Sequence, residues 1–167
     1  EFAAQPSSPE ATAAEALIAL ASWPEPSDRD RVVGVYRPLK REIINVASAL
    51  QPVINQILTG HQTEPVKLAA INALTQLHLD NAGESLRSLV ADTKAPAELR
   101  LEALRALEQL KDSRLADAAK IAQADDNELL RKEGNRLSNE LHPEDAVAQI
   151  RTTLEKGSVA EKQGAIT

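Results

Sequence analysis

The chain has 167 residues, enough for one domain with a hydrophobic core, and a formal net charge of -6. This acidic balance argues against a nucleic-acid or anionic-membrane surface, because neutralising phosphates requires a basic stripe. The absence of cysteine excludes disulfides, thiolate metal sites and covalent haem attachment within this chain. No apolar run approaches the ~18 residues of a membrane-spanning helix.

The N-terminal residues 1–8 precede the first periodic segment, and we expect them to be disordered or derived from cloning. The opening dipeptide Glu1-Phe2 is typical of a cloning site, and the sequence contains no methionine. The last residues begin a repeated segment that the chain does not finish. We therefore expect a segment excised from a longer protein, truncated at its C-terminal end, with any export signal in the part that is missing.

Four twelve-residue segments share one apolar pattern with helical spacing, and a fifth copy begins at Ala160. The four are Pro9–Leu20, Val66–Leu77, Leu99–Leu110 and Leu130–Leu141. Apolar residues three and four positions apart predict a helix in each copy. A small residue recurs at one position, where it would let a neighbouring helix approach closely. These residues are Ala13, Ala70, Ala103, Gly134 and Gly164.

A second helical pattern lies between the copies, with apolar residues clustered at 50–58, 86–90, 115–122 and 147–154. Asp112, Asn127 and Ser158 stand where an N-cap is expected. From Val66 onwards the copies start 33, 31 and 30 residues apart. Helices that alternate at this period predict an all-α protein, a right-handed α-α superhelix of about four to five helical pairs. We expect it to form a single domain over residues 9–167.

Residues 23–41 interrupt the repeat, because the first two copies start 57 residues apart. This insert holds Trp23 and Tyr36 together with Arg29, Arg31, Arg37, Lys40 and Arg41. Arginine and aromatic residues dominate the energetics of protein interfaces, so these side chains are candidates for a docking patch. The alternative is structural: the two rings fill a gap where the insert packs on the first helices, and the arginines pair with neighbouring carboxylates. Further interaction candidates, expected to be exposed on a concave face, are Lys67, Glu102, Arg105 and Arg136.

Catalytic and metal-binding patterns are weak in this sequence. His61, His78 and His142 each stand at or just beyond the expected end of a helix, where a histidine bonds unpaired carbonyls. None of them forms the i, i+4 pair typical of a zinc helix. The carboxylates at helix starts are explained by the helix dipole. We therefore expect no enzyme activity, and no catalytic, metal or cofactor-binding residue in this chain.

The helix alternation, the Leu50-Gln-Pro-Val53 start and the early basic residue of the other helices resemble HEAT repeats over residues 45–167. In that family an acid in the turn often pairs with the basic residue, forming a ladder. The resemblance implies Lys67, Arg100 and Arg131 as the bases and Asp92 and Asp125 as acids. The turn at 60–61 has Gly-His instead, so the first rung is missing.

The insert sequence SWPEPSDRDRVVGVYRPL and the terminal Glu161-Lys-Gln163 resemble the HEAT segment of large exported haem-binding, dehydrogenase-like proteins of planctomycetes. The resemblance implies a periplasmic or exported bacterial scaffold, which binds a protein partner or the flanking domains of the same polypeptide. Haem would then belong to the parent protein and not to this chain, which lacks Cys-x-x-Cys-His. The alternative is a HEAT-like protein that acts on a ligand, such as a tetrapyrrole-binding or phycobilin lyase-like subunit.

Overall fold

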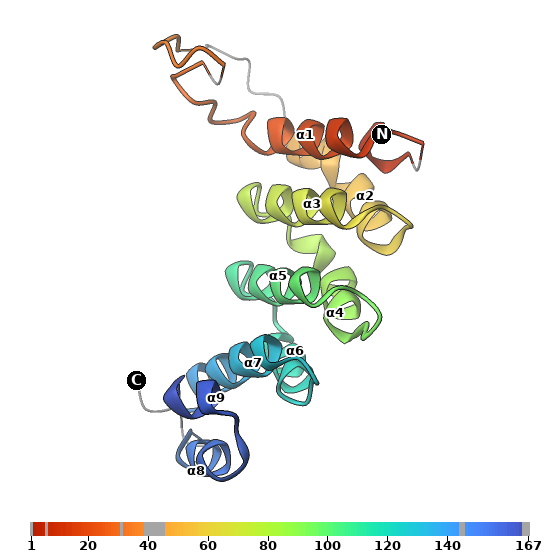
Figure 1. The fold of residues 1–167 in the computed structure, drawn as a ribbon. Helices are drawn as coiled ribbons and strands as arrows, with labels where there is room; N and C mark the ends of the chain where they lie inside the picture. Colours follow the sequence, from red (N-terminus) through yellow and green to blue (C-terminus); the bar gives the residue numbers. More distant parts are fainter. Residues whose placement is uncertain (1, 6, 31, 39–45, 144–145, 165–167) are drawn as a thin grey trace. The chain divides into compact units, whose positions relative to one another are not determined.

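The computed structural model describes residues 2–5, 7–30, 32–38, 46–143 and 146–164, and its regular elements in these ranges are all helical (Figure 1). In chain order they are η1 (Phe2–Ala4), α1 (Glu10–Ala21), α2 (Val46–Thr59), α3 (Glu64–Gln76), η2 (Asp80–Ala82), α4 (Gly83–Ala91), α5 (Ala97–Gln109), α6 (Leu115–Gln123), α7 (Glu128–Leu141), α8 (Ala146–Lys156) and α9 (Val159–Gly164). The all-α prediction is confirmed, and each twelve-residue segment falls on a separate helix. In the ranges described, no helix has the length and apolar character needed to cross a membrane.

The chain divides into two compact units, Glu1–Leu86 and Arg87–Thr167, and the boundary lies inside α4. The single repeat domain expected over residues 9–167 stays a prediction.

In the first unit α1 packs along α3, and α2 packs against α3. The core is formed by apolar side chains with almost no exposed surface, among them Leu17, Ile54, Ile57, Val66 and Leu74. Within the segment expected to be disordered or cloning-derived, Phe2–Ala4 form η1, which contacts α1 and α2 and buries two alanines. Gln62 Nε2 donates a hydrogen bond of 2.8 Å to the carbonyl of Ala4. These residues are therefore part of the packed unit.

The start of α2 differs from the sequence-based expectation. The Leu50-Gln-Pro-Val53 pattern predicts a helix start there, but α2 already includes Val46, so that Pro52 lies inside the helix. Proline inside a helix removes one backbone N–H donor. The burial of Val46, Leu50 and Ile54 along one face gives the apolar contact that holds the helix through this position.

In the second unit α6 packs closely against α7, and α5, α8 and α9 also contact α7. Gly134 permits this approach: a Cβ atom there would lie 2.6 Å from the backbone nitrogen of Gln123 and 2.8 Å from the carbonyl oxygen of Ala119. The corresponding alanines of the other copies, Ala13, Ala70 and Ala103, are at most 1% exposed. The predicted close approach is confirmed for Gly134, and the three alanines are buried.

Two of the three predicted N-caps are confirmed. The side chain of Asn127 accepts from the N–H groups of Leu129 and Leu130 at the start of α7. Ser158 and Glu161 bond each other's backbone N–H groups, which is a capping box at the start of α9. The prediction for Asp112 is wrong, because α6 begins later and Arg114 is its N-cap.

Candidate protein-interaction surfaces

Residues 28–30 and 32–37 of the insert form a short hairpin. The N–H of Asp30 donates to the carbonyl of Val35 (2.9 Å), and the N–H of Arg37 donates to the carbonyl of Asp28 (2.7 Å). Between these bonds Arg29 and Tyr36 form an isolated antiparallel bridge. This hairpin was not predicted from the sequence, because the segment lacks the apolar/polar alternation of a regular strand pair.

The turn of the hairpin is held by Asp30 and Gly34. The Asp30 carboxylate accepts hydrogen bonds from the N–H groups of Val32 (2.8 Å) and Val33 (3.0 Å). These bonds, the one from Val33 first, hold the pKa of Asp30 below its usual value. Gly34 has φ +68°, a left-handed conformation that glycine adopts without the steric cost of a Cβ atom. The backbone itself therefore fixes the shape of the turn.

Four apolar side chains of this hairpin face solvent, and we call them the hairpin tip. Val32 is 92% exposed, Val33 68%, Val35 59% and Tyr36 65%. Single exposed apolar residues are ordinary on protein surfaces, whereas a contiguous group marks a candidate interaction surface.

The other predicted residues of the insert lie in different environments. Arg29 and Arg37 are exposed, and Arg29 Nη1 donates to the carbonyl of Gly34 at 3.2 Å. Trp23 is half-buried, and its backbone N–H donates to the carbonyl of Leu20 at the end of α1. Tyr36, by contrast, is exposed and fills no gap. Arg31, Lys40 and Arg41 lie outside the described residues.

A second set of predicted residues forms an ion-pair network on α5 and α7. Arg136 bonds Glu108 (2.6 Å), Glu133 (2.8 Å) and Glu140 (2.8 Å). The hydrogen bonds that Arg136 donates to Glu133 and then to Glu108 raise its pKa further above the usual value. Arg105 bonds Glu102 (2.6 Å) and approaches Glu133 (3.9 Å). Glu102, Arg105 and Arg136 are thus partly exposed but already paired within the chain. Lys67, on α3, is half-buried.

Arg100 makes a buried link between the end of α4 and the segment that connects α6 to α7. Its Nε and Nη2 donate to the carbonyl of Val90 (3.0 and 2.9 Å), and Nη2 also bonds the carboxylate of Asp125. The two side chains are only 5% and 7% exposed. Burial by itself raises the pKa of Asp125, but hydrogen bonds from the Asn127 N–H and from Arg100 outweigh it, so that the pKa lies below its usual value.

Arg131 repeats this arrangement one copy later. Its Nη1 donates to the carbonyls of Asp125 (2.9 Å) and Asp126 (2.8 Å), and its Nε bonds Glu161 (2.8 Å). The Arg100–Asp125 pair agrees with the predicted ladder, whereas Glu161 was missed as an acid. The Ser-x-x-Glu capping box was the sequence signal that could have located it. Lys67 and Asp92 belong to different units, and their pairing stays a prediction.

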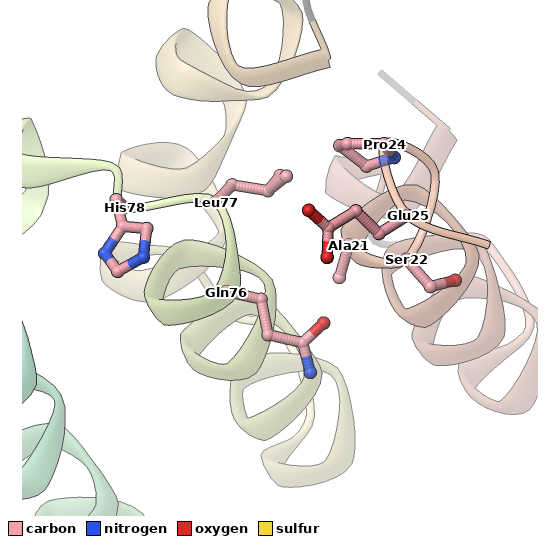
Figure 2. A pocket seen from close by; sticks show the side chains of 7 residues that line it. All are labelled: Ala21, Ser22, Pro24, Glu25, Gln76, Leu77 and His78. Atoms are coloured by element: carbon pink, nitrogen blue, oxygen red, sulfur yellow. The ribbon is translucent and has the colours of Figure 1, made fainter. Parts of the chain in front are cut away.

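A groove opens between the C-terminal ends of α1 and α3, and we call it the helix-end groove (Figure 2). Its volume is about 440 Å³, and its lining is Ala21, Ser22, Pro24, Glu25, Gln76, Leu77 and His78. Figure 2 shows the carboxylate of Glu25 pointing into the space between the two helix ends. Neither helix has a basic residue in its last turn, so the partial negative charge of both ends is not neutralised from within these helices.

The histidines lie beside helix ends, as predicted. His142 is the C-cap of α7, and His78 follows α3 with φ 51°. Among the described residues, no group of three or more histidine and carboxylate side chains is arranged to hold a metal ion.

No protein-family model matches this chain, and no similar curated protein or solved structure was found.

Proposed function

We propose that the chain is a non-enzymatic protein-interaction module, a HEAT-like scaffold segment of a larger exported haem-binding or dehydrogenase-like protein. The observation that carries this proposal is the exposed hairpin tip. Its three valines and its tyrosine face solvent on a turn held by the chain's own hydrogen bonds. A partner that covered them would remove their exposed apolar surface from water.

The shape of the hairpin favours binding over a purely structural role. Because Asp30 and Gly34 fix the turn before any partner arrives, little loop ordering would oppose association. Exposed Arg29 and Arg37 stand close to the tip in the sequence, and arginine is enriched at protein interfaces. The hairpin therefore combines an apolar centre with a charged edge.

The scaffold part of the proposal rests on the recurring contacts of the helices. Helices follow one another with small residues at buried positions, and two arginines link elements on either side of them. Arg100 joins α4 to the segment before α7, and Arg131 joins that segment to α9. Both features are typical of stacked repeats. We accordingly propose that the helices of the whole chain stack as a right-handed superhelix of four to five helical pairs.

The proposal is tested by placing the photo-crosslinking residue p-benzoylphenylalanine at Val33 in the full-length protein. A cross-link to one defined protein or flanking domain is expected, and purified components should reproduce it. The same residue at Lys132, an exposed position of α7, is the control and should give no adduct. Equal adducts at both positions, or none at either, would contradict the proposal.

The tetrapyrrole-binding alternative is separated from the scaffold by titrating the chain with haem or bilin. We expect no saturable absorbance change. A stoichiometric Soret shift would show tetrapyrrole binding and would contradict the scaffold proposal.

A further inference from the structure

We propose that α9 is an acid-released strap: the Glu161 carboxylate docks this helix on α7, and the helix leaves when that carboxylate takes up a proton. The rest of the second unit stays folded when α9 leaves. The inference concerns the second unit alone, so it does not depend on the hairpin or on the function proposed for it.

The docking of α9 depends on little buried apolar surface. The helix has six residues, and a helix this short is not stable by itself in water. Val159 is 74% exposed, and Glu161, which is 7% exposed, is the one buried side chain among those that the structure describes in this helix. In this part of the helix, docking therefore rests on a polar contact.

The Glu161 carboxylate joins α9 to α7. Its Oε1 accepts a hydrogen bond from Arg131 Nε (2.8 Å), and its Oε2 accepts one from the N–H of Ser158 (2.7 Å). Ser158 Oγ in turn donates to the Glu128 carboxylate at the start of α7 (2.7 Å). A protonated Glu161 would stay buried but would lose the charge that makes its bond to a guanidinium strong.

The surroundings of Glu161 favour its ionised form while α9 is docked. The hydrogen bond from Arg131 and then the one from the Ser158 N–H hold the pKa of Glu161 below its usual value, and burial opposes them. Four further charged side chains border these contacts, two acidic and two basic. They are Glu128, Asp126, Lys156 and Lys162. Docking is therefore strongest above the ordinary glutamate pKa of about 4.3 and weakens as the pH falls through the lower pKa of the docked state.

The contacts that hold α7 do not need α9. Arg131 Nη1 donates to the carbonyls of Asp125 (2.9 Å) and Asp126 (2.8 Å), and these bonds remain when Glu161 is lost. Gly134 keeps α7 in close contact with α6, and the side chain of Leu137 on α7 is 1% exposed. Release of α9 is therefore a local opening and not the unfolding of the unit.

Release of α9 would open a polar cavity of about 690 Å³. Ser158 and Glu161 form part of its lining, together with side chains of α6, α7 and α8 that include Arg131, Asn135 and Thr153. With α9 docked, the side chain of Arg131 is 30% exposed. Acid would thus uncover a guanidinium group and neighbouring polar groups that the strap partly covers at neutral pH.

The experiment is amide hydrogen exchange of the full chain, measured by NMR and corrected for the intrinsic pH dependence of exchange. The N–H of Lys162 reports on α9, because it donates to the carbonyl of Ser158 (3.0 Å). The N–H of Leu137, inside α7, reports on the rest of the unit. The test variant is Glu161→Gln. The matched control is Glu155→Gln, which makes the same change at an exposed carboxylate of α8.

We expect the protection of Lys162 to lie at least about tenfold below that of Leu137. In the wild type and in Glu155→Gln it should fall about fivefold between about pH 7 and about pH 3.5. In Glu161→Gln it should be at least about tenfold lower than in the wild type at about pH 7, because a charged hydrogen bond is lost, and it should hardly change with pH.

Equal protection of Lys162 and Leu137 overturns the inference, because α9 would then open only when the whole unit unfolds. The inference also fails if Glu161→Gln exchanges like the wild type, or if the protection of Lys162 in the wild type does not fall with pH. The cross-linking at Val33 tests a different surface, so either proposal can fail without the other.

Discussion

The buried Arg100–Asp125 pair offers the sharpest test of how the second unit is held together. Arg100→Met removes the two hydrogen bonds to the Val90 carbonyl and the ion pair to Asp125, whose side chain is only 7% exposed in the native chain. Removing one partner of a buried pair leaves an uncompensated charge, which costs about 3–5 kcal/mol. Native domains have only about 5–15 kcal/mol of unfolding free energy in total, so this loss is a large part of it.

The pH dependence of the free energy of unfolding gives an independent check of the loss expected for Arg100→Met. Because the pKa of Asp125 is lowered in the folded chain, its ionisation stabilises the fold above about pH 4, and that stability is lost as the pH falls through the folded pKa. In Arg100→Met the burial of Asp125 remains, and only the Asn127 N–H and the charge of Arg131 are left to lower its pKa, so folding favours ionised Asp125 less than in the wild type. The deficit of the variant should therefore be largest near about pH 7 and shrink towards about pH 3.

The measurement is urea denaturation of wild type, Arg100→Met, Asp125→Asn and the double variant at several pH values. The double variant should lose less than the sum of the single losses, with a coupling of about 1–3 kcal/mol. Arg105→Met, five positions along α5 and 46% exposed, is the matched control and should cost at most about 1 kcal/mol. A loss below about 1 kcal/mol for Arg100→Met, or strict additivity, would refute the reasoning.

Three further predictions concern other contacts of the second unit. Gly134→Ala should destabilise the chain by about 1–3 kcal/mol, because the Cβ of the alanine would meet the α6 backbone. This should outweigh the higher helix propensity of alanine. A raised melting temperature would contradict the close approach of the two helices. Glu161→Gln should flatten the acid limb of a pH–stability curve. The hydrogen bond from Arg131 holds the pKa of Glu161 low, so the ionisation of Glu161 stabilises the fold only above about pH 4. An unchanged curve between about pH 6 and about pH 3 would argue against this bond. Arg136→Met should lower the free energy of unfolding by about 1 kcal/mol at low salt, because it leaves three glutamates near one another. This loss should be smaller in about 0.5 M NaCl. A loss that does not depend on salt would indicate that Arg136 acts through packing instead.

Much of the local structure followed from the sequence because it depends on neighbours along the chain. The spacing of apolar residues predicted where the helices lie, since a period of 3.6 residues places them on one face. Asn127 and Ser158 were recognisable as caps because a cap bonds N–H groups two or three residues away. The buried position of Gly134 followed from its alignment with the alanines of the other copies.

The candidate site was less predictable, for a physical reason. The sequence identified the insert by its failure to repeat, together with Trp23 and Tyr36, but not which of the two rings is exposed. The exposure of a ring depends on what packs against it from elsewhere in the chain. The same holds for Arg105 and Arg136, whose carboxylate partners include residues on another helix.

The sequence by itself determined an all-helical chain with small residues at close contacts and one interruption, because these features are written in local spacing and composition. The tertiary structure decided how the insert folds. Asp30 accepts hydrogen bonds from the N–H groups of Val32 and Val33, and the side chains of both valines face solvent. It also decided that Arg131 pairs with Glu161, thirty residues away, and that α1 and α3 end side by side around Glu25. These contacts join residues far apart in the chain, and only the packing of the helices brings them together.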